Sequence, residues 1–201
     1  MMEWTAFEDQ ARAEGYTCIC GIDEAGRGPL AGPVYAAAVV LRPGQVIEGV
    51  NDSKKLSEKK REALFDTICS QCAAYGIGSA TEKEIDEINI LNATYLAMQR
   101  AVAALPVQPD CALVDGNRAP DLPLKVRTII KGDAQSASIA AASILAKVSR
   151  DRYMLQMAEK YPQYAFEKHK GYGTKLHYER LEQYGISPIH RLSFLKKWMN
   201  R

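Results

Sequence analysis

No stretch of this sequence is apolar for anything near the ~20 residues that a membrane-spanning helix requires. The first nine residues also lack the basic segment and apolar run of a secretory signal. Cysteine is scarce: the chain has five among 201 residues, and an odd number cannot form a complete set of disulfides. The sequence also has no internal repeats or low-complexity segments. Together these absences predict a cytoplasmic protein with no membrane association and a single domain over residues 1–201.

The charge is small overall and unevenly distributed. The net charge is +2, but residues 168–201 carry a local charge of +6, which leaves −4 for the remainder. A basic end beside an acidic body suits a metal site that handles a polyanion. An ordinary solvated surface is the commoner explanation for such an imbalance taken alone.

Apolar periodicity predicts strands that alternate with helices. Five strands are expected, at residues 17–22, 34–41, 75–80, 111–114 and 124–130. Helices are expected at residues 57–73, between a Thr81/Glu84 capping box and Pro106, and at residues 135–160. Short helices should follow in the basic region after about residue 160. This order is typical of an α/β domain with a helical C-terminal region.

The segment GIDEAGRG at residues 21–28 has the glycine spacing of a nucleotide-binding loop. However, Arg27 and Gly28 replace the lysine and hydroxyl residues that such a loop needs. Asp23 and Glu24 would also face the phosphates, and like charges at ~4 Å cost on the order of 1–4 kcal/mol. The G-x-G-x-x-G spacing of a dinucleotide site is absent. Both nucleotide-binding interpretations are therefore excluded.

A divalent cation would remove this conflict, because Mg²⁺ or Mn²⁺ binds carboxylate and phosphate oxygens together. Neighbouring side chains of a strand point to opposite faces, so Asp23 and Glu24 can share a site only where the strand ends or bends. Asp115 ends a buried strand, and Asp133 lies between a strand and a long helix. Acids at strand ends converge on the crevice where α/β folds bind ligands. Two cations ~3.5–4 Å apart would balance these four acids and support displacement at phosphorus.

Six motifs, in order, resemble those of bacterial ribonuclease HII: GIDEAGRGP (21–29), NDSKKL (51–56), VDG (114–116), KGD (131–133), AASILAKVSRD (141–151) and HKGYGT (169–174). The resemblance implies a ribonuclease H-like α/β fold, with a five-stranded mixed sheet flanked by helices and a helical C-terminal extension. It implies an endonuclease that uses Mg²⁺ or Mn²⁺, with two ions during catalysis. Such an enzyme cuts RNA in RNA–DNA hybrids and nicks 5′ of ribonucleotides embedded in duplex DNA, leaving 3′-hydroxyl and 5′-phosphate ends.

The resemblance also implies roles for particular residues. The catalytic, metal-binding set would be Asp23, Glu24, Asp115 and Asp133. The substrate-binding set would be Gly26, Arg27 and Gly28 at the ribose 2′-hydroxyl, Lys54 and Lys55 at phosphates, and Tyr172 at the sugar of the RNA–DNA junction. These roles are chemically reasonable, because only the 2′-hydroxyl distinguishes RNA from DNA and a glycine backbone can approach it closely.

The cysteines and histidines are not expected to form metal or redox sites. Cys69 and Cys72 form a C-x-x-C pair but lie in a predicted helix, which favours core packing over zinc binding or redox chemistry. The three histidines lack the spacing of a shared metal site and are expected on the surface or facing nucleic acid: His169, His177 and His190.

The remaining charged side chains are expected in ion pairs or in solvent. Asp151 should pair with Arg150 or Arg152, which are its neighbours in the chain. Lys59, Lys60 and Arg61 are expected to be solvated. The chain end lacks the motif of a glutamine and paired aromatic residues with which some related nucleases bind a sliding clamp, so no clamp partner is expected. The protein is expected to be a monomer. Contacts to the duplex backbone are expected from Lys196, Lys197 and Arg201.

Two other functions stay open. One is a nuclease or strand-transfer enzyme of the same fold that acts on DNA. The other is a non-catalytic nucleic-acid-binding module, which would need the basic tail but not the acids.

Overall fold

The computed structural model describes residues 4–118 and 120–200. Its sheet has five strands: β1 (Ile19–Ala25), β2 (Val34–Val40), β3 (Ala74–Ala80), β4 (Cys111–Asp115) and β5 (Lys125–Ile129). The strand order is β3-β2-β1-β4-β5. The pairs β3–β2 and β2–β1 are antiparallel, whereas β1–β4 and β4–β5 are parallel. The predicted five-stranded mixed sheet is confirmed.

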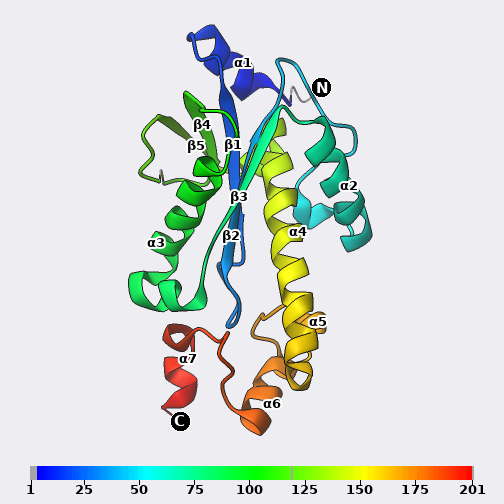
Figure 1. Cartoon of the computed structure of the whole chain (residues 1–201), viewed down its shortest axis with the longest axis vertical. Helices are drawn as coiled ribbons and strands as arrows, with labels where there is room; N and C mark the ends of the chain where they lie inside the picture. Colours follow the sequence, from blue (N-terminus) through cyan, green and yellow to red (C-terminus); the bar gives the residue numbers. More distant parts are fainter. Residues whose placement is uncertain (1–3, 119, 201) are drawn as a thin grey trace.

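Helices cover both faces of this sheet. The α-helices are α1 (Ala6–Ala13), α2 (Glu58–Gln71), α3 (Glu82–Ala103), α4 (Ala137–Lys160), α5 (Phe166–His169), α6 (Lys175–Tyr184) and α7 (Leu192–Met199). In Figure 1, α3 lies on one side of the sheet, α4 and α2 lie on the other, and α5 to α7 gather at the lower end. The predicted helical C-terminal extension is therefore present. None of the helices in the described part of the chain has the length and apolarity needed to cross a bilayer.

The alternation of β2 explains the two faces of the sheet. Ala36 and Ala38 pack with α3, whereas Ala37 and Val39 pack with α2 and α4. Small residues on the strands and on α4 allow this helix to pack close to the sheet. A methyl group on Gly21 of β1 would lie only 2.2 Å from the carbonyl carbon of Ser138. The alanine-rich first half of α4 therefore lies directly against β1, as its composition predicts.

Helix α3 begins as predicted and then departs from the prediction. Thr81 and Glu84 form the expected capping box. Asn89 then interrupts the helix with a φ of 66°, and its side-chain oxygen accepts hydrogen bonds from the backbone nitrogens of Leu91 and Asn92. The Asn89 side chain therefore caps a second helical start within α3, at a residue whose φ of 66° and ψ of 164° are not helical.

Candidate active site

The ends of β1 and β4 bring acids together. These parallel strands pair as far as Ile22 and Val114, so Asp23 and Asp115 are the next residues on two adjacent strands. Strand β1 does not end there as expected, because β2 continues to pair with Asp23 and Glu24 on its other edge. Beyond Ile22, β1 no longer pairs with β4 but still pairs with β2. Side chains near this point can therefore face the open end of β4.

One pocket of about 250 Å³ collects most of the predicted site residues. Its lining includes three of the four acids, the turn that follows them and residues from three other parts of the chain: Asp23, Glu24, Ala25, Gly26, Arg27, Gly28, Ser53, Lys54, Asp115, Ser143, Lys147 and Tyr172. These residues come together from five parts of the chain: β1, η1 (Ser53–Lys55), β4, α4 and the loop before α6. Lys55 is exposed and does not line this pocket.

Asp133 lies at the edge of the same pocket. It occupies the single-turn helix η2 (Gly132–Ala134) between β5 and α4 and is 4% exposed. Its carboxylate is 3.4 Å from the ammonium nitrogen of Lys54, which lines the pocket. The backbone nitrogen of Gly132 donates a 2.6 Å hydrogen bond to Asp115, so η2 is joined to the end of β4. The four predicted acids thus belong to one connected region.

The acids disfavour each other's charge. Burial raises the pKa of Asp23 well above its usual range, with further increases from Glu24 and Asp115. Burial also raises the pKa of Glu24, although Arg27, whose guanidinium lies 3.3 Å away, opposes the shift. The pKa of Asp115 is raised by burial and by Asp133. Clustered, buried carboxylates of this kind are characteristic of functional sites.

The donor chemistry fits a hard divalent cation. Carboxylate oxygens are the ligands that Mg²⁺ and Mn²⁺ prefer, and a cation would neutralise the repulsion within the pocket. As they stand, no three His, Cys, Asp or Glu side chains within residues 4–118 and 120–200 are close enough together to ligate one ion. The residues that fit this role are Asp23, Glu24, Asp115 and Asp133.

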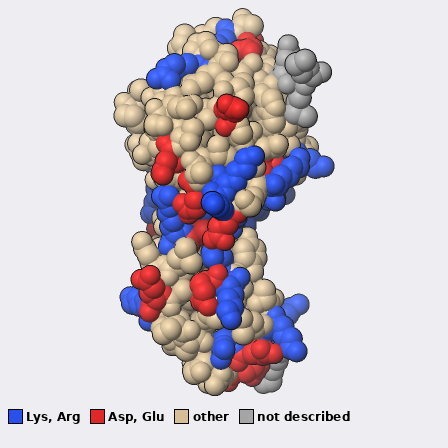
Figure 2. All heavy atoms as spheres, turned by 90° about the vertical axis from the view of Figure 1, so that its right-hand side faces the viewer, with Lys and Arg blue, Asp and Glu red and all other residues tan. Residues whose placement is uncertain are grey.

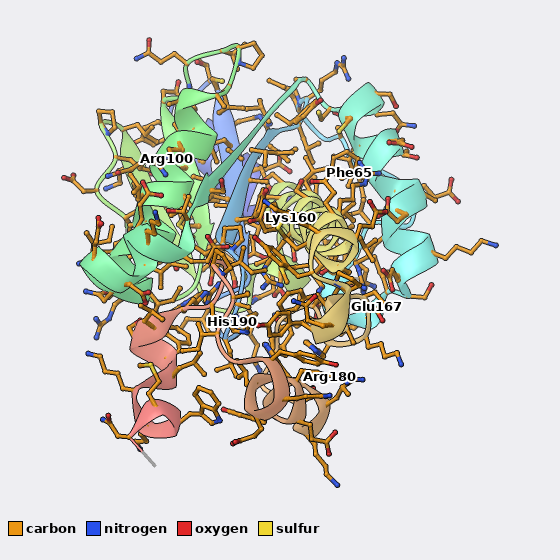
Figure 3. The ribbon with its side chains drawn as sticks, turned by 60° about the horizontal axis from the view of Figure 1, so that its bottom comes forward. Phe65, Arg100, Lys160, Glu167, Arg180 and His190 are labelled. Carbon is orange, nitrogen blue, oxygen red and sulfur yellow. The ribbon has the colours of Figure 1, made fainter. Side chains whose placement is uncertain are left out.

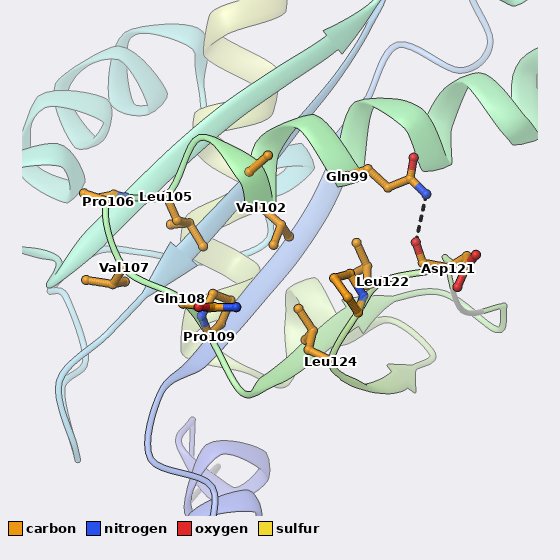
Figure 4. A pocket seen from close by; sticks show the side chains of 12 residues that line it. Gln99, Val102, Leu105, Pro106, Val107, Gln108, Pro109, Asp121, Leu122 and Leu124 are labelled. Atoms are coloured by element: carbon orange, nitrogen blue, oxygen red, sulfur yellow. Dashed lines mark hydrogen bonds between the residues drawn. The ribbon is translucent and has the colours of Figure 1, made fainter.

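A larger groove lies apart from these acids. It measures about 620 Å³ and runs between the end of α3 and the segment before β5, where Gln99 donates a 2.8 Å hydrogen bond to the Asp121 carbonyl (Figure 4). Its lining is mainly apolar and includes Val102, Leu105 and Leu122. None of the four acids contributes to it, so size alone does not identify the site.

Two pocket residues on α4 were not predicted. Ser143 shares a 2.7 Å hydrogen bond with Ser53, and the Lys147 ammonium is 2.7 Å from Asp151. Asp151 therefore pairs with Lys147, and at 4.0 Å with Arg61, rather than with its chain neighbours Arg150 and Arg152. The signal was present in the sequence: residues 143, 147 and 151 form one polar stripe at a spacing of four along an otherwise alanine-rich helix.

Arg61 also departs from its prediction. Its side chain is 14% exposed and donates to the Ser53 carbonyl at 2.9 Å, so it holds η1 rather than projecting into solvent. Lys59 and Lys60 are exposed, as predicted. Cys72 is buried and Cys69 is half-buried against the same apolar cluster, so both pack as predicted. Cys20 and Cys111 are buried as well. Lys196 and Lys197 are exposed on α7, while Arg201 lies outside the described residues.

The three histidines were wrongly predicted to be on the surface. They are 7%, 0% and 3% exposed at His169, His177 and His190, respectively. Figure 3 shows His190 at the lower end of the molecule, where the C-terminal helices meet the sheet. A search for metal-ligand spacing could not detect this burial. Two of the rings bond to each other and all three bond to backbone groups, and these contacts form only when the chain folds.

A hydrogen-bonded chain links two of these rings to Tyr172. The backbone nitrogen of Ser187 donates to Nδ1 of His190 at 2.9 Å, which leaves the proton of neutral His190 on Nε2. That nitrogen lies 3.0 Å from Nε2 of His177, whose Nδ1 is 2.9 Å from the carbonyl oxygen of Tyr172. Each contact then has one donor and one acceptor only if both rings are neutral. The two histidines, both neutral, therefore hold the backbone carbonyl of Tyr172.

These histidines predict sensitivity to acid. Burial, chiefly, lowers the pKa of His177 and of His190 from 6.5 to about 4. Between these values the unfolded chain binds protons that the folded protein does not, so stability is complete above pH 6.5 and falls as the pH drops towards 4. Each ring contributes a slope of about 1.4 kcal/mol per pH unit near pH 5.5.

The comparison that checks this is between the wild type and His177→Asn, whose amide can still donate to Tyr172. Urea unfolding in EDTA between pH 7 and pH 4.5 should show a shallower pH dependence for the variant. The acids of the pocket titrate in both proteins, so the difference isolates the histidine. Equal slopes would show that His177 is not held neutral.

Comparisons with known proteins place this chain in a family. The family model described as ribonuclease HII matches residues 20–197. The chain is 60% identical over 189 residues to ribonuclease HII of Caldicellulosiruptor bescii, covering 94% of this chain and 92% of that protein. It is 58% identical over 190 residues to ribonuclease HII of Clostridioides difficile, covering 94% and 74%.

A solved structure shows the same architecture. The crystal structure of ribonuclease H2 from Pyrococcus horikoshii superposes with a TM-score of 0.73 at 31% identity, covering 88% of this chain and 93% of that one. The ribonuclease H-like fold implied by the motifs is thereby confirmed. The chain belongs to the ribonuclease HII family and is an enzyme of that family, a type 2 ribonuclease H that hydrolyses phosphodiester bonds.

Proposed function

We propose that this enzyme cuts the RNA strand of RNA–DNA hybrids and nicks duplex DNA on the 5′ side of an embedded ribonucleotide, leaving a 3′-hydroxyl and a 5′-phosphate. The observation that carries the proposal is the single pocket shared by three acids, the turn at residues 26–28 and Tyr172. It joins groups suited to phosphodiester chemistry with groups suited to recognising a sugar.

The four acids are proposed to hold Mg²⁺ or Mn²⁺, with two ions present during catalysis. Bound divalent ions would supply an activated water and neutralise charge on the departing 3′-oxygen. Asp23 and Asp115 come from adjacent parallel strands, and Glu24 and Asp133 flank them. Rigid strands thus carry the central ligands, which favours a well-defined geometry.

Recognition of the sugar is assigned to the turn and to Tyr172. Gly28 has no side chain to keep a ribose away from its backbone, and a methyl group there would lie 3.8 Å from the Tyr172 ring. That ring is 44% exposed, so it can meet a sugar from solvent. A ring packed against the next sugar would favour a residue without a 2′-hydroxyl, as at an RNA–DNA junction.

Basic side chains around the pocket are proposed to bind phosphates. Lys54 and Lys147 line the pocket itself. Figure 2 shows further lysine and arginine side chains among acidic ones across the narrow middle of one face of the molecule. Such contacts supply affinity that falls with salt and carries little sequence information.

The test is cleavage of a DNA duplex that contains one ribonucleotide, with the product ends mapped. We expect a single nick 5′ of the ribonucleotide in Mg²⁺ or Mn²⁺, none in EDTA, and no cleavage of the matched all-DNA duplex. Cleavage of the all-DNA duplex would instead favour a DNA nuclease of the same fold. Binding without turnover at saturating Mn²⁺ would favour the non-catalytic module.

A further inference from the structure

Two arginines near the pocket are almost completely buried. Arg150 on α4 is 1% exposed and Arg191, which precedes α7, is 0% exposed. Arg191 belongs to the basic C-terminal region, for which a solvated surface is the commoner explanation, so its burial is unexpected. A buried guanidinium is tolerated only when its donors are satisfied. The partners of these two side chains therefore indicate what they do.

Arg191 donates to three backbone carbonyls of the segment at residues 26–32. Its Nη2 donates to Gly26 at 2.6 Å, its Nη1 to Arg27 at 3.0 Å and its Nε to Gly32 at 2.8 Å. Two of these carbonyls belong to the turn that is proposed to read the ribose. The flat, forked guanidinium fixes all three at once, which a lysine ammonium cannot do from the same position.

Arg150 holds the other end of the same segment and the loop of Tyr172. Its Nε donates to Pro33 at 3.1 Å, and its Nη2 and Nη1 donate at 3.0 Å to Ala31 and Lys170, respectively. The guanidinium carbon lies 5.8 Å from the centre of the Tyr172 ring. The two arginines thus span residues 26–33 and reach the loop at residues 170–172.

Close packing makes this arrangement specific. A methyl group on Gly26, whose φ is +98°, would lie 2.1 Å from Nε of Arg150. Backbone hydrogen bonds of 2.8 Å add to the frame, from Leu30 to Gly171 and from Arg191 to Leu30. The turn is therefore joined to α4, to the Tyr172 loop and to the segment before α7, and the two guanidiniums satisfy carbonyls at each junction.

We propose that Arg150 and Arg191 are positioning residues for sugar selection: they fix the turn at residues 26–28 and the Tyr172 loop in one frame, so that both face the same nucleotide. Neither arginine touches the substrate. The inference rests on the proposed function, because it assumes that this turn reads the 2′-hydroxyl. It adds a reason why α4 and the C-terminal region are needed for that selection.

The test uses Arg191→Lys in the full chain and two duplexes that differ at one sugar, a ribonucleotide or its 2′-fluoro analogue. We expect kcat for the ribonucleotide to fall by about 100-fold, as for a misplacement of ~1 Å. Cleavage of the 2′-fluoro duplex and affinity for an all-DNA duplex should change little. The ratio of the two cleavage rates should therefore fall at least tenfold, whereas partial unfolding would lower both rates equally.

Two further variants keep the result interpretable. Arg150→Lys should lower the same ratio and replaces Arg191→Lys if that protein does not fold. Arg152→Lys is the matched control: it lies on α4 two residues from Arg150, but it pairs with Glu62 and stacks on Phe65, so the ratio should stay at the wild-type value.

The outcomes separate the two proposals. A wild-type enzyme that cuts both duplexes equally would overturn the proposed function and this inference with it. A selective wild type whose ratio is unchanged in folded Arg191→Lys and Arg150→Lys would overturn this inference alone.

Discussion

Asp23→Asn is expected to abolish cleavage while making the metal-free protein more stable. The side chain is 4% exposed, and burial together with Glu24 and Asp115 raises its pKa well above the usual range. The charged carboxylate is therefore unfavourable in the folded state when no cation is bound. Asparagine has nearly the same shape and no charge, so it removes this cost but also removes a proposed metal ligand.

The expected loss of kcat is about a thousandfold or more, since removal of even a single transition-state donor costs about 10²–10³. The expected gain in the free energy of unfolding is about 1–2 kcal/mol in EDTA, a magnitude common for substitutions that relieve strain at functional sites. For a chain of this size that corresponds to a rise in Tm of roughly 2–8 °C. Opposite effects on activity and stability distinguish a functional carboxylate from a structural one.

Thermal unfolding with and without Mn²⁺ and a cleavage assay check this prediction together. Mn²⁺ should raise the Tm of the wild type, because a ligand that binds only the folded state stabilises it, and should raise the Tm of Asp23→Asn much less. Asp66→Asn, an exposed acid on α2, is the control and should change neither property. A variant that cleaves within tenfold of the wild type would remove Asp23 from the site.

Gly21→Ala is expected to destabilise the fold by about 3 kcal/mol or more, at the upper end of the usual cost of overpacking. The added methyl group would lie 2.2 Å from the carbonyl carbon of Ser138 and 2.3 Å from the backbone nitrogen of Ile139. Both atoms belong to the α4 backbone, so no side-chain rotation relieves the overlap. The helix would have to move away from β1 near Asp23.

Gly28→Ala in the same motif is the matched control for folding. Its nearest contact would be the Tyr172 ring at 3.8 Å, an ordinary van der Waals distance. We expect its free energy of unfolding to stay within about 0.5 kcal/mol of the wild type. Cleavage at a ribonucleotide should nonetheless fall by about 10- to 100-fold, because the methyl group would stand where the turn is proposed to approach the ribose.

Urea unfolding and cleavage of the single-ribonucleotide duplex measure both variants. An unchanged unfolding midpoint for Gly21→Ala would contradict the close packing of α4 on β1. Full activity of Gly28→Ala would contradict an approach of this turn to the sugar.

Local patterns predicted the elements because their causes are local. The capping box at Thr81 and Glu84 satisfies free backbone groups within one turn of helix, and it forms as predicted. Apolar runs predicted all five strands, although β1 extends to Ala25 rather than ending at residue 22. The extension depends on pairing with β2, a partner that lies outside the window of any local pattern.

Errors concentrated at polar side chains whose partners are not their immediate neighbours in the chain. Asp151 was assigned to its chain neighbours, yet a helix directs residues four apart to the same face, and it pairs with Lys147. The histidines were placed at the surface, whereas in the interior two of them bond to each other and all three bond to backbone groups a few residues away. Arg191 was not singled out from the sequence, and its partners are carbonyls 159 to 165 residues earlier in the chain.

By itself, the sequence determined which elements form, which acids lie close to strand ends and which glycines leave room beside them, because propensity, periodicity and side-chain size act over a few residues. Only the tertiary structure decided that Asp23 and Asp115 lie on adjacent strands, that two neutral histidines support Tyr172 and that two buried arginines hold the turn. Strand register and burial depend on contacts between segments up to about 165 residues apart in the chain, so they are established only when those segments pack together.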